Sequence, residues 1–280
     1  MPEWRLSGVA DPDPDRRTSL AAHAGEGVRA YASVAELVEA ERPDALVVAS
    51  PPRLHLEHAE LAARAGALAL VEKPPGTSAE EASRLGSLGR VRIGFNRRFS
   101  HLRTVNGRVP RTGPLELRLR ISYRRGAWRP HAVRDDALAD LGPHLADLAG
   151  CLLGGEIEGA RAGEITARSA SVELAGPRGR AVLRCETDAS WSERVEVRDG
   201  SGRVAARSVH GGVARNIGSR LRRGEHPLVD SLTRQLRALA RVARGEQAPE
   251  LAEAPDGARA MAAIEAARRS AADGGGWVAP

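Results

Sequence analysis

The sequence predicts a chain of two parts, an α/β half built on a parallel sheet and an α+β half built on an open, mainly antiparallel sheet. In the first half, short apolar segments alternate with helix-like segments, as in a parallel sheet covered by helices. In the second half, longer segments alternate polar and apolar residues, which is typical of half-buried antiparallel strands. A length of 280 residues with 42% hydrophobic content suits two domains. We expect these domains to be residues 1–96 and 97–280.

The expected elements of the first half follow one another at short spacing. Ser33 and Glu36 have the spacing of a capping box, which predicts a helix start at that point. We expect strands at residues 4–10, 28–31, 45–49, 68–72 and 91–95, and helices at 15–24, 33–41, 54–65 and 77–88.

In the second half, the clearest helix is predicted over residues 137–153, where it ends at two glycines. A tight turn at residues 176–179 joins two of the expected strands. We expect strands at residues 114–123, 164–174, 180–187 and 192–198, and two further amphipathic helices at 227–244 and 255–272.

Composition excludes several classes of function. The net charge of +6 comes from arginines scattered among acidic residues, and aromatic residues make up only 3% of the chain, so no basic stripe with stacking residues predicts nucleic-acid binding. Apolar runs are too short to cross a bilayer, and the first residues show no secretion signal. Two cysteines are too few for a disulfide framework. We therefore expect a cytoplasmic protein that binds neither nucleic acid nor membrane.

Lys73 is the only lysine among 42 lysines and arginines. A coding bias toward arginine would explain why every other basic residue of this kind is arginine. A function that retains Lys73 against this bias would then require an amine. An ammonium is a compact charge that loses its proton when buried, whereas a guanidinium is planar and always charged. Lys73 also follows an expected strand of the parallel layer, where strand ends face the ligand crevice. The alternative is that this single lysine remains in the sequence by chance.

Asp140 and His144 lie four residues apart on an expected helix, so they share one face and the carboxylate can orient the imidazole. That arrangement suits an acid–base pair. A plain surface or core pair is the alternative reading. A metal site made with Asp147 is conceivable from the ligand types, but no other residue supports it and we expect none.

Four motifs occur in order along the chain. They are Val47-Val48-Ala49-Ser50-Pro51-Pro52 with His55, then Val71-Glu72-Lys73-Pro74, then Gly94-Phe95-Asn96-Arg97-Arg98-Phe99, and then Asp140-Leu141-Gly142-Pro143-His144-Leu145-Ala146-Asp147. In this order and spacing they resemble the glucose-fructose oxidoreductase and inositol dehydrogenase (Gfo/Idh/MocA) family. The closing Gly276-Trp277-Val278 resembles the end of that family too.

The resemblance implies an incomplete Rossmann-type domain and an NAD(P)-dependent oxidoreductase that transfers a hydride at a secondary alcohol of a sugar, amino sugar or cyclitol. It implies that Lys73 and His144 act on the substrate hydroxyl, that Asp140 helps to bind substrate and orient the site, and that the Lys73–Pro74 bond is often cis. Residues expected to bind the cofactor are Asp11, Ser50, Pro51, His55, Glu72 and Lys73. Residues expected to bind the substrate are Asn96, Arg98, Tyr123 and Trp128.

A dinucleotide site of this class uses a glycine-rich turn after its first strand, about 20 residues before an acidic residue at the end of the second strand. Asp11 fits that acidic residue and favours NAD over NADP, because a carboxylate repels a 2′-phosphate. The glycine fingerprint would then precede residue 1. We therefore expect an open parallel sheet, unless residues 4–10 pair with 45–49, and weak binding of NAD to this chain. A start site placed downstream, or a fragment, would explain the pattern.

Two other functions remain open at this stage. One is a non-catalytic relative that lost its cofactor site and acts as a binding or regulatory subunit. The other is a glycosidase that uses bound NAD for transient oxidation. An open sheet face in the second half suggests a homodimer or homotetramer, because exposed apolar sheet faces call for cover.

Overall fold

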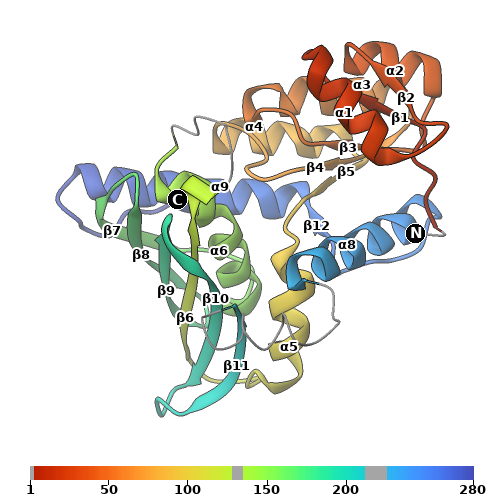
Figure 1. Ribbon diagram of the computed structural model, residues 1–280. Coiled ribbons are helices and arrows are strands. Elements are labelled where there is room, and N and C mark those ends of the chain that lie inside the picture. Colours follow the sequence, from red (N-terminus) through yellow and green to blue (C-terminus); the bar gives the residue numbers. More distant parts are fainter. Residues whose placement is uncertain (1–2, 128–134, 212–225) are drawn as a thin grey trace.

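The computed structural model describes residues 3–127, 135–211 and 226–280. Two bodies are evident in Figure 1: the first half of the chain forms the upper right part, and a sheet of long strands stands at the lower left beside helices α6 and α9. The α/β half followed by a mainly antiparallel sheet is therefore confirmed. No helix in the described ranges is both long and apolar enough to cross a membrane.

The parallel layer of the first half is a sheet of order β12-β5-β4-β3. Its central strand, β4, is buried at every residue, as expected for a strand covered on both faces. Helix α2 begins at Ser33, whose side chain accepts a hydrogen bond from the backbone of Glu36, as the capping signature predicts. The elements are α2 (Val34–Glu41), β3 (Ala45–Val48), α3 (His55–Arg64), β4 (Leu68–Val71), α4 (Ala79–Arg84), β5 (Val91–Ile93) and β12 (Ala252–Glu253).

The first strands of the chain do not join this sheet. Strand β1 (Gly8–Ala10) pairs in parallel with β2 (Arg29–Tyr31) in a separate two-stranded sheet, and α1 (Pro14–Ala24) connects them. Strand β3 pairs with β4 alone, and Val47 within it is 50% exposed. Of the two arrangements considered from the sequence, the open one is present: β1 and β3 both end their sheets, with no ladder between them.

A helix from late in the sequence covers the parallel layer. Helix α8 (Pro227–Ala243) places Leu239 against Leu68 and Leu70 of β4 in one buried apolar cluster. The indole of Trp4 donates a hydrogen bond of 2.8 Å to the carbonyl of Leu236 in the same helix. With β12 paired antiparallel to β5, residues 227–253 return to the first body, as Figure 1 shows for α8 and β12 below β3–β5.

The second body is a six-stranded sheet of order β11-β10-β6-β9-β8-β7. Only the β6–β9 pair is parallel, so the sheet is mainly antiparallel, as predicted. Its strands are β6 (Leu115–Arg124), β7 (Gly159–Ile165), β8 (Ser169–Gly176), β9 (Gly179–Glu186), β10 (Asp188–Asp199) and β11 (Val204–Gly211).

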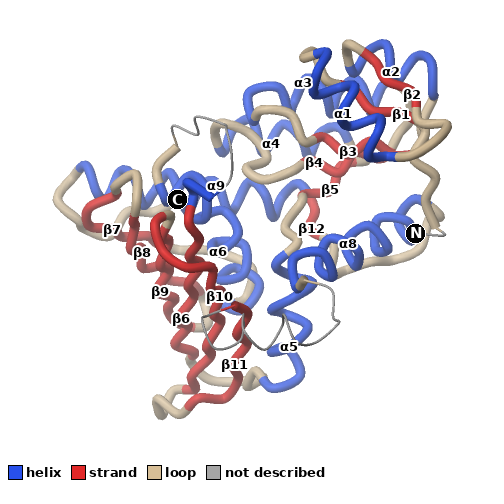
Figure 2. The backbone as a smooth tube through the Cα atoms, viewed as in Figure 1, coloured by secondary structure: helices blue, strands red, loops and turns tan. Residues whose placement is uncertain are grey.

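Two long helices cover one face of that sheet. In Figure 2, α6 (Ala137–Leu153) lies along the strands, and α9 (Ala254–Ala272) crosses beside it. The two helices approach closely at Gly142, where a side chain would come within 2.7 Å of Ile264 in α9. Because α6 carries Asp140 and His144, this packing sets where the candidate catalytic residues stand.

The opposite face of the sheet is charged, which corrects the basis of our expectation about assembly. On β6, the buried Leu117 and Leu119 alternate with Arg118 and Arg120, which are exposed. Arg120 lies opposite Arg194 of β10 and is also paired in register with Arg184 of β9. Because guanidinium groups remain hydrated, this face gives no apolar drive to association.

Candidate active site

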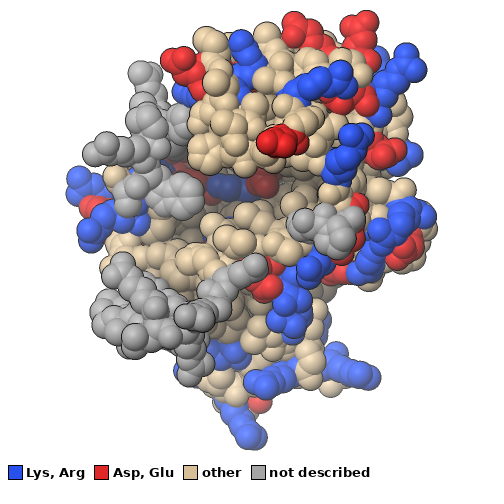
Figure 3. Space-filling view, turned by 45° about the vertical axis from the view of Figure 1, so that its right-hand side comes forward, with Lys and Arg blue, Asp and Glu red and all other residues tan. Residues whose placement is uncertain are grey.

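The site begins where strands β3 and β4 end, at the junction of the two bodies. The space-filling view shows a hollow between them, with acidic and basic atoms together at its bottom (Figure 3). Glu72 and Lys73 directly follow β4, and Ser50 and Pro51 follow β3 after one residue. The peptide bond between Lys73 and Pro74 is cis, as the family resemblance implied.

Lys73 reaches across the junction to helix α6. Its Nζ donates to Asp140 twice, to the main-chain carbonyl at 2.8 Å and to Oδ1 at 3.2 Å. Both side chains are largely buried, with 24% of the Lys73 side chain and 15% of the Asp140 side chain exposed. The structure thus brings the only lysine of the chain onto the predicted aspartate, which lies 67 residues further along.

The other oxygen of Asp140 is also occupied. Tyr123 on β6 donates its hydroxyl to Oδ2, and Arg125 donates Nη2 to the same atom at 3.1 Å. Burial alone would raise the pKa of Asp140, but the charge of Lys73 and these hydrogen bonds outweigh it, so the pKa lies below its usual value. Asp140 is therefore an ionised carboxylate that holds two cations.

This arrangement corrects the predicted role of Asp140. The expectation that its carboxylate orients the imidazole of His144 is wrong, because both carboxylate oxygens are bound to Lys73, Tyr123 and Arg125. Sharing a helix face brought the two residues near each other, but strand β6 and the loop after β4 supply the stronger donors.

His144 is 3% exposed and lies edge-on to Phe95, with ring centroids 6.1 Å apart. Burial, helped by the charges of Arg97 and Lys73, lowers the pKa of His144 well below its usual value. Its Nδ1 is buried and has no hydrogen-bond partner among the described residues. The ring is thus neutral at physiological pH and keeps one nitrogen without a partner.

His55 is not placed to touch a ligand, which corrects its expected role in cofactor binding. Its ring is 1% exposed, with Nε2 2.7 Å from the carbonyl of Ser50 and Nδ1 2.9 Å from the carbonyl of Pro74. The imidazole therefore ties the loop after β3 to the loop after β4. The Ser50 hydroxyl in turn lies 2.9 Å from Nδ1 of His58.

Glu72 lies beside the site, and burial shifts the pKa of its carboxyl group. Loss of hydration raises its pKa, although Lys73 and Arg97 act in the opposite direction. Its Oε2 accepts a hydrogen bond of 3.3 Å from the backbone of Lys73. Gly94 makes room for it, because a Cβ there would lie 2.9 Å from the carboxyl carbon.

Two residues expected to bind substrate are placed elsewhere. Asn96 is 3% exposed, and its amide donates to Ser231 of α8 at 3.3 Å. Arg98 donates through Nε to Asp147 at 2.9 Å and through Nη2 to both Asp147 and Asp256, the latter at 3.1 Å. These are corrections: both side chains are buried against protein partners and join the segment after β5 to α6, α8 and α9.

The charge of Asp147 and its hydrogen bonds raise the pKa of the Arg98 guanidinium, in spite of burial that would lower it. Arg98 therefore stays protonated and ties α6 to the segment that follows β5. The carboxylate of Asp147 is used entirely by this pair, one helical turn beyond His144.

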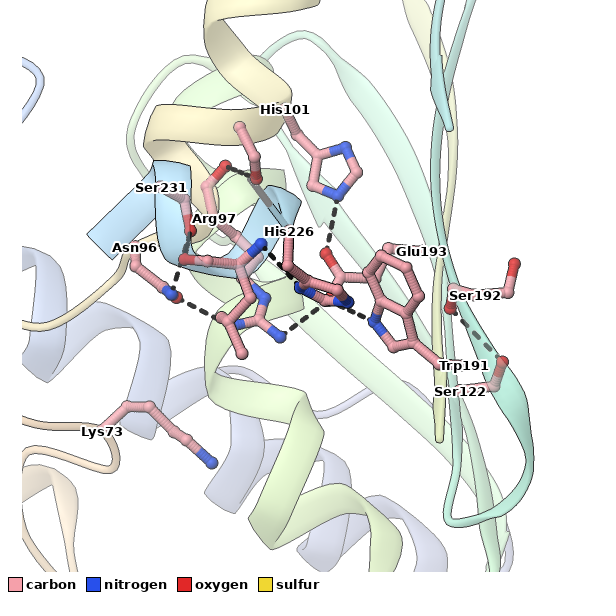
Figure 4. Close-up of polar contacts among 12 residues, drawn as sticks. Lys73, Asn96, Arg97, His101, Ser122, Trp191, Ser192, Glu193, His226 and Ser231 are labelled. Atoms are coloured by element: carbon pink, nitrogen blue, oxygen red, sulfur yellow. Dashed lines mark hydrogen bonds and ion pairs between the residues drawn. The ribbon is translucent and has the colours of Figure 1, made fainter. Parts of the chain in front are cut away.

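The sequence did not single out the polar cluster drawn in Figure 4. Arg97 donates to Asn96 at 2.9 Å and to Glu193 of β10 at 2.7 Å, and the second oxygen of Glu193 lies 3.1 Å from Nε2 of His101. These contacts lower the pKa of Glu193 to about 2, against burial that would raise it. Figure 4 shows Lys73 extending its amine from the facing loop.

No distinguishing signal in the sequence marked Arg125 or Glu193, and Arg97 was marked only by its place in a motif. Arginine is abundant in every part of the chain, so its type does not mark a site. Arg97 lies inside a recognised motif, which was the one available pointer. Trp128, which we expected in the substrate pocket, lies outside the described residues.

Fold and site together define a class of protein, a nucleotide-binding α/β body joined to an open-sheet body with lysine, aspartate and histidine at the junction. Residues 1–90 match the Gfo/Idh/MocA family, described as an oxidoreductase family with an NAD-binding Rossmann fold. This match over the first 90 residues agrees with the resemblance that the order of the four motifs predicts.

Similar proteins agree with this assignment. Inositol 2-dehydrogenase 2 of Saccharopolyspora erythraea is 37% identical over 161 residues, which cover 55% of this chain and 47% of that protein. The structure of a putative myo-inositol dehydrogenase from Sinorhizobium meliloti 1021 has a TM-score of 0.76 at 22% identity, covering 98% of this chain and 92% of that one.

An inositol dehydrogenase homologue from Azotobacter vinelandii, solved with NADH and myo-inositol, has a TM-score of 0.75 at 17% identity over 99% of this chain and 90% of that one. At such identities, the solved structures establish the fold. The chain spans about half the length, or less, of the curated relatives it matches.

The residues at the carboxyl end of β4 fit the nicotinamide end of a dinucleotide cofactor. Glu72 and Lys73 stand at the carboxyl end of β4, and His144 presents a buried nitrogen without a partner near them. Asp11 directly follows β1, as predicted, and its Oδ1 accepts a hydrogen bond from the backbone of Asp13 at 2.8 Å. Between β1 and β3, the glycines Gly25 and Gly27 lie in the turn from α1 to β2, and not in a loop from a strand into a helix, which is where a diphosphate binds.

Proposed function

We propose that the protein is an NAD-dependent oxidoreductase that acts on a secondary alcohol of a sugar, amino sugar or cyclitol. Lys73, Asp140 and His144 are the residues at the reacting atoms. The observation that carries this proposal is the double hydrogen bond from Lys73 to Asp140, at 2.8 and 3.2 Å, in the crevice where two strands of the parallel sheet end.

Lys73 is fitted to bind the oxygen of the reacting alcohol. An ammonium has three donors, and Asp140 takes two of them, so one remains for a ligand. As the hydroxyl proton departs ahead of the hydride, negative charge would grow on this oxygen until the C=O bond forms, and a fixed ammonium stabilises that charge. Asp140 holds the amine in place, while Tyr123 and Arg125 hold Asp140.

His144 is fitted to take the hydroxyl proton. Its lowered pKa keeps the ring neutral, and a neutral imidazole has one nitrogen that can accept a proton. When bound, the nicotinamide supplies the acceptor for the hydride. With that acceptor bound, His144 would take the hydroxyl hydrogen as a proton, the hydrogen on carbon would leave as hydride, and the alcohol would become a ketone.

Glu72 and the loop of Ser50 and Pro51 would border the nicotinamide end of the cofactor, and Asp11 would meet the adenosine ribose. A carboxylate accepts hydrogen bonds from a ribose 2′-hydroxyl and repels a 2′-phosphate, which supports NAD over NADP. We also propose the division into residues 1–96 and 97–280, with residues 227–253 returning to the first body through α8 and β12.

The test is reduction of NAD, supplied at millimolar concentration, with a panel of cyclitols, sugars and amino sugars. We expect turnover of at least one polyol, and a loss of roughly 10²–10³-fold in kcat/KM for His144→Ala, the order seen when one catalytic group is removed. Arg118→Gln on the exposed sheet face is the matched control and keeps its activity. Absence of turnover on the whole panel would contradict the proposal.

The same assay separates the two other candidate functions. Cleavage of aryl glycosides without accumulation of NADH would indicate the NAD-dependent glycosidase. Polyol binding by calorimetry without any reaction would indicate a binding or regulatory relative.

A further inference from the structure

The face of the six-stranded sheet that turns away from α6 and α9 carries a row of three arginines. Arg194 of β10 lies in register with Arg120 of β6, and Arg120 lies in register with Arg184 of β9. All three residues are exposed. Neighbouring strands lie about 4.8 Å apart, so the row extends roughly 10 Å across the sheet. Like charges directly opposite each other destabilise a sheet, so this row costs stability while nothing is bound to it.

The row has too few carboxylates around it. Arg120 pairs with Glu186 at 2.6 Å, but no carboxylate within the described ranges lies at ion-pair distance from Arg184 or Arg194. Glu196, on the same face, already holds Arg198 at 2.7 Å and Arg207 at 2.6 Å. The other glutamates of β6 and β8 that point to this face are also paired, each with an arginine outside the row: Glu116 and Glu173.

The segments outside the described ranges do not bring the missing negative charge. Residues 128–134 and 212–225 contain six arginines and a single acidic residue, Glu225. Their sequence therefore adds more positive than negative charge. The two unpaired arginines of the row call for an anionic partner, because a guanidinium forms strong paired hydrogen bonds with a carboxylate or a phosphate.

The glutamates among the arginines argue against a nucleic acid as this partner. A nucleic-acid backbone is negative at every repeat and would meet these carboxylates as well as the row. The exposed aromatic ring of this region, Trp277, is already held between two guanidinium groups, with Arg161 5.1 Å and Arg180 5.3 Å from its centroid. It is therefore not free to stack on a base.

A second copy of this chain is also a poor match for the row. Its own face would bring the same three arginines, and like charges across an interface oppose association. A different protein can place carboxylates opposite the row and hydrogen-bond donors opposite the glutamates. Arginine is also among the residues enriched at contacts between proteins.

We propose that this face binds an acidic helix of another protein, whose carboxylates at positions i, i+4 and i+7 meet Arg194, Arg120 and Arg184. With a rise of 1.5 Å per residue, the first and last of these carboxylates are about 10 Å apart along the helix, which matches the length of the row. Helix α6, which carries the proposed catalytic residues, packs on the opposite face of the sheet (Figure 2). The inference is therefore independent of the proposed function.

Binding of a labelled peptide, followed by fluorescence anisotropy, tests the proposal. The probe is an alanine-rich helical peptide with glutamates at i, i+4 and i+7, and an otherwise identical peptide with glutamines is its control. At low ionic strength we expect the glutamate peptide to bind at least tenfold more tightly, and we expect this preference to shrink as salt is added. Equal affinity of the two peptides would overturn the inference.

Paired variants show whether the row itself binds the peptide. Arg184→Gln combined with Arg194→Gln should weaken binding of the glutamate peptide about tenfold, because two charge-assisted contacts are lost. Arg84→Gln combined with Arg90→Gln removes the same charge from two exposed positions of the first body and should leave binding unchanged. An equal loss in both double variants would show that only net charge matters, and the inference would fail.

A thermal melt gives a second, independent readout. The variant with both Arg184→Gln and Arg194→Gln should melt at a higher temperature than the parent protein, because it relieves the opposition between like charges. A lower midpoint would show that the fold itself needs these arginines, and it would remove the reason to infer a partner.

The other possible occupants are measured with the same proteins. Single-stranded DNA of ten nucleotides is titrated in place of the peptide, and sedimentation velocity at low and high salt reports association of the protein with itself. We expect weaker binding of the DNA than of the glutamate peptide, and no self-association that depends on Arg184 and Arg194. Tighter binding of the DNA, or a dimer that the double variant abolishes, would assign this face to a different occupant and overturn the inference.

Discussion

Lys73 and Asp140 are joined by two hydrogen bonds, one to the carboxylate and one to the main-chain carbonyl, although one residue follows a strand of the first body and the other lies on a helix of the second. The pair therefore links the two bodies at the point where the chemistry is proposed. Its geometry depends on Tyr123 and Arg125, which hold the second carboxylate oxygen.

Replacing Asp140 with asparagine removes the negative charge that holds the Lys73 amine in place and keeps a side chain of similar size. We expect Asp140→Asn to lower kcat by roughly 10²-fold, because a misplaced reacting group costs about that much, with a smaller effect on folding. Steady-state kinetics and a thermal melt measure the two effects. Asp188→Asn, at an exposed carboxylate 3.7 Å from Arg168, is the control and should leave kcat unchanged. Unaltered kcat in Asp140→Asn would remove this residue from the site.

The buried pair of Arg98 and Asp147 should matter for stability. Arg98→Met leaves the buried Asp147 without its cation, which costs about 3–5 kcal/mol, whereas Asp147→Asn leaves Arg98 paired with Asp256 alone and should cost less. The double variant Arg98→Met with Asp147→Leu removes both charges and should be more stable than either single variant. Urea unfolding provides the free energies. Single variants within about 0.5 kcal/mol of the parent would show that the pair is dispensable.

Glu193 should make stability depend on pH in the acid range. Its pKa falls to about 2 in the folded protein from a usual value of 4.5. A lowered carboxyl pKa contributes stability that is present above about 4.5 and is lost as the pH falls toward 2. The shift corresponds to about 3 kcal/mol, and we expect Glu193→Gln to lose it.

Urea unfolding at two pH values checks the sign. Glu193→Gln should be less stable than the parent protein at pH 7, and the difference should shrink as the pH approaches 3. Glu116→Gln, at an exposed carboxylate paired with Arg118, is the matched control. A stability difference that stays constant with pH would contradict the assignment.

Gly142 should be required for the contact between α6 and α9. A Cβ at this position lies 2.7 Å from atoms of Ile264 and Leu138, so Gly142→Ala should cost about 1–3 kcal/mol by overpacking. Gly107→Ala provides the control, because a Cβ there meets nothing within 4 Å. A thermal melt of both variants makes the comparison. Equal midpoints would show that the helices move apart without cost.

Local signals explain which elements the sequence predicted well. Helix α6 was placed at residues 137–153, as observed, because Asp136 caps its start and Gly154 ends it in the left-handed region, with φ 106°. The predicted strand 164–174 is instead parts of two strands, β7 and β8, separated at Thr166, whose hydroxyl accepts backbone hydrogen bonds from Arg168 and Ser169. A Thr-Ala-Arg-Ser turn has no glycine or proline to mark it. Strand β11 was not predicted at all.

Long-range packing explains what remained hidden. The return of α8 to the first body depends on an apolar cluster that joins Leu68 to Leu239, and no local pattern reports such a contact. Lys73, Asp140 and His144 were found because a rare residue type, helical spacing and motif order mark them. The sequence did not predict which side chains donate hydrogen bonds to Asp140. Tyr123 and Arg125 reach it from the end of strand β6, whose register is set by the neighbouring strands.

The central claim is that the amine of Lys73 acts on the substrate oxygen, and chemical rescue tests it most directly. We expect Lys73→Ala to lower kcat/KM by about 10²–10³-fold, and added methylammonium to restore part of the activity in a saturable manner. Tetramethylammonium, which has the charge but no N–H donor, should not restore it. Full activity of Lys73→Ala without any added amine would contradict the account.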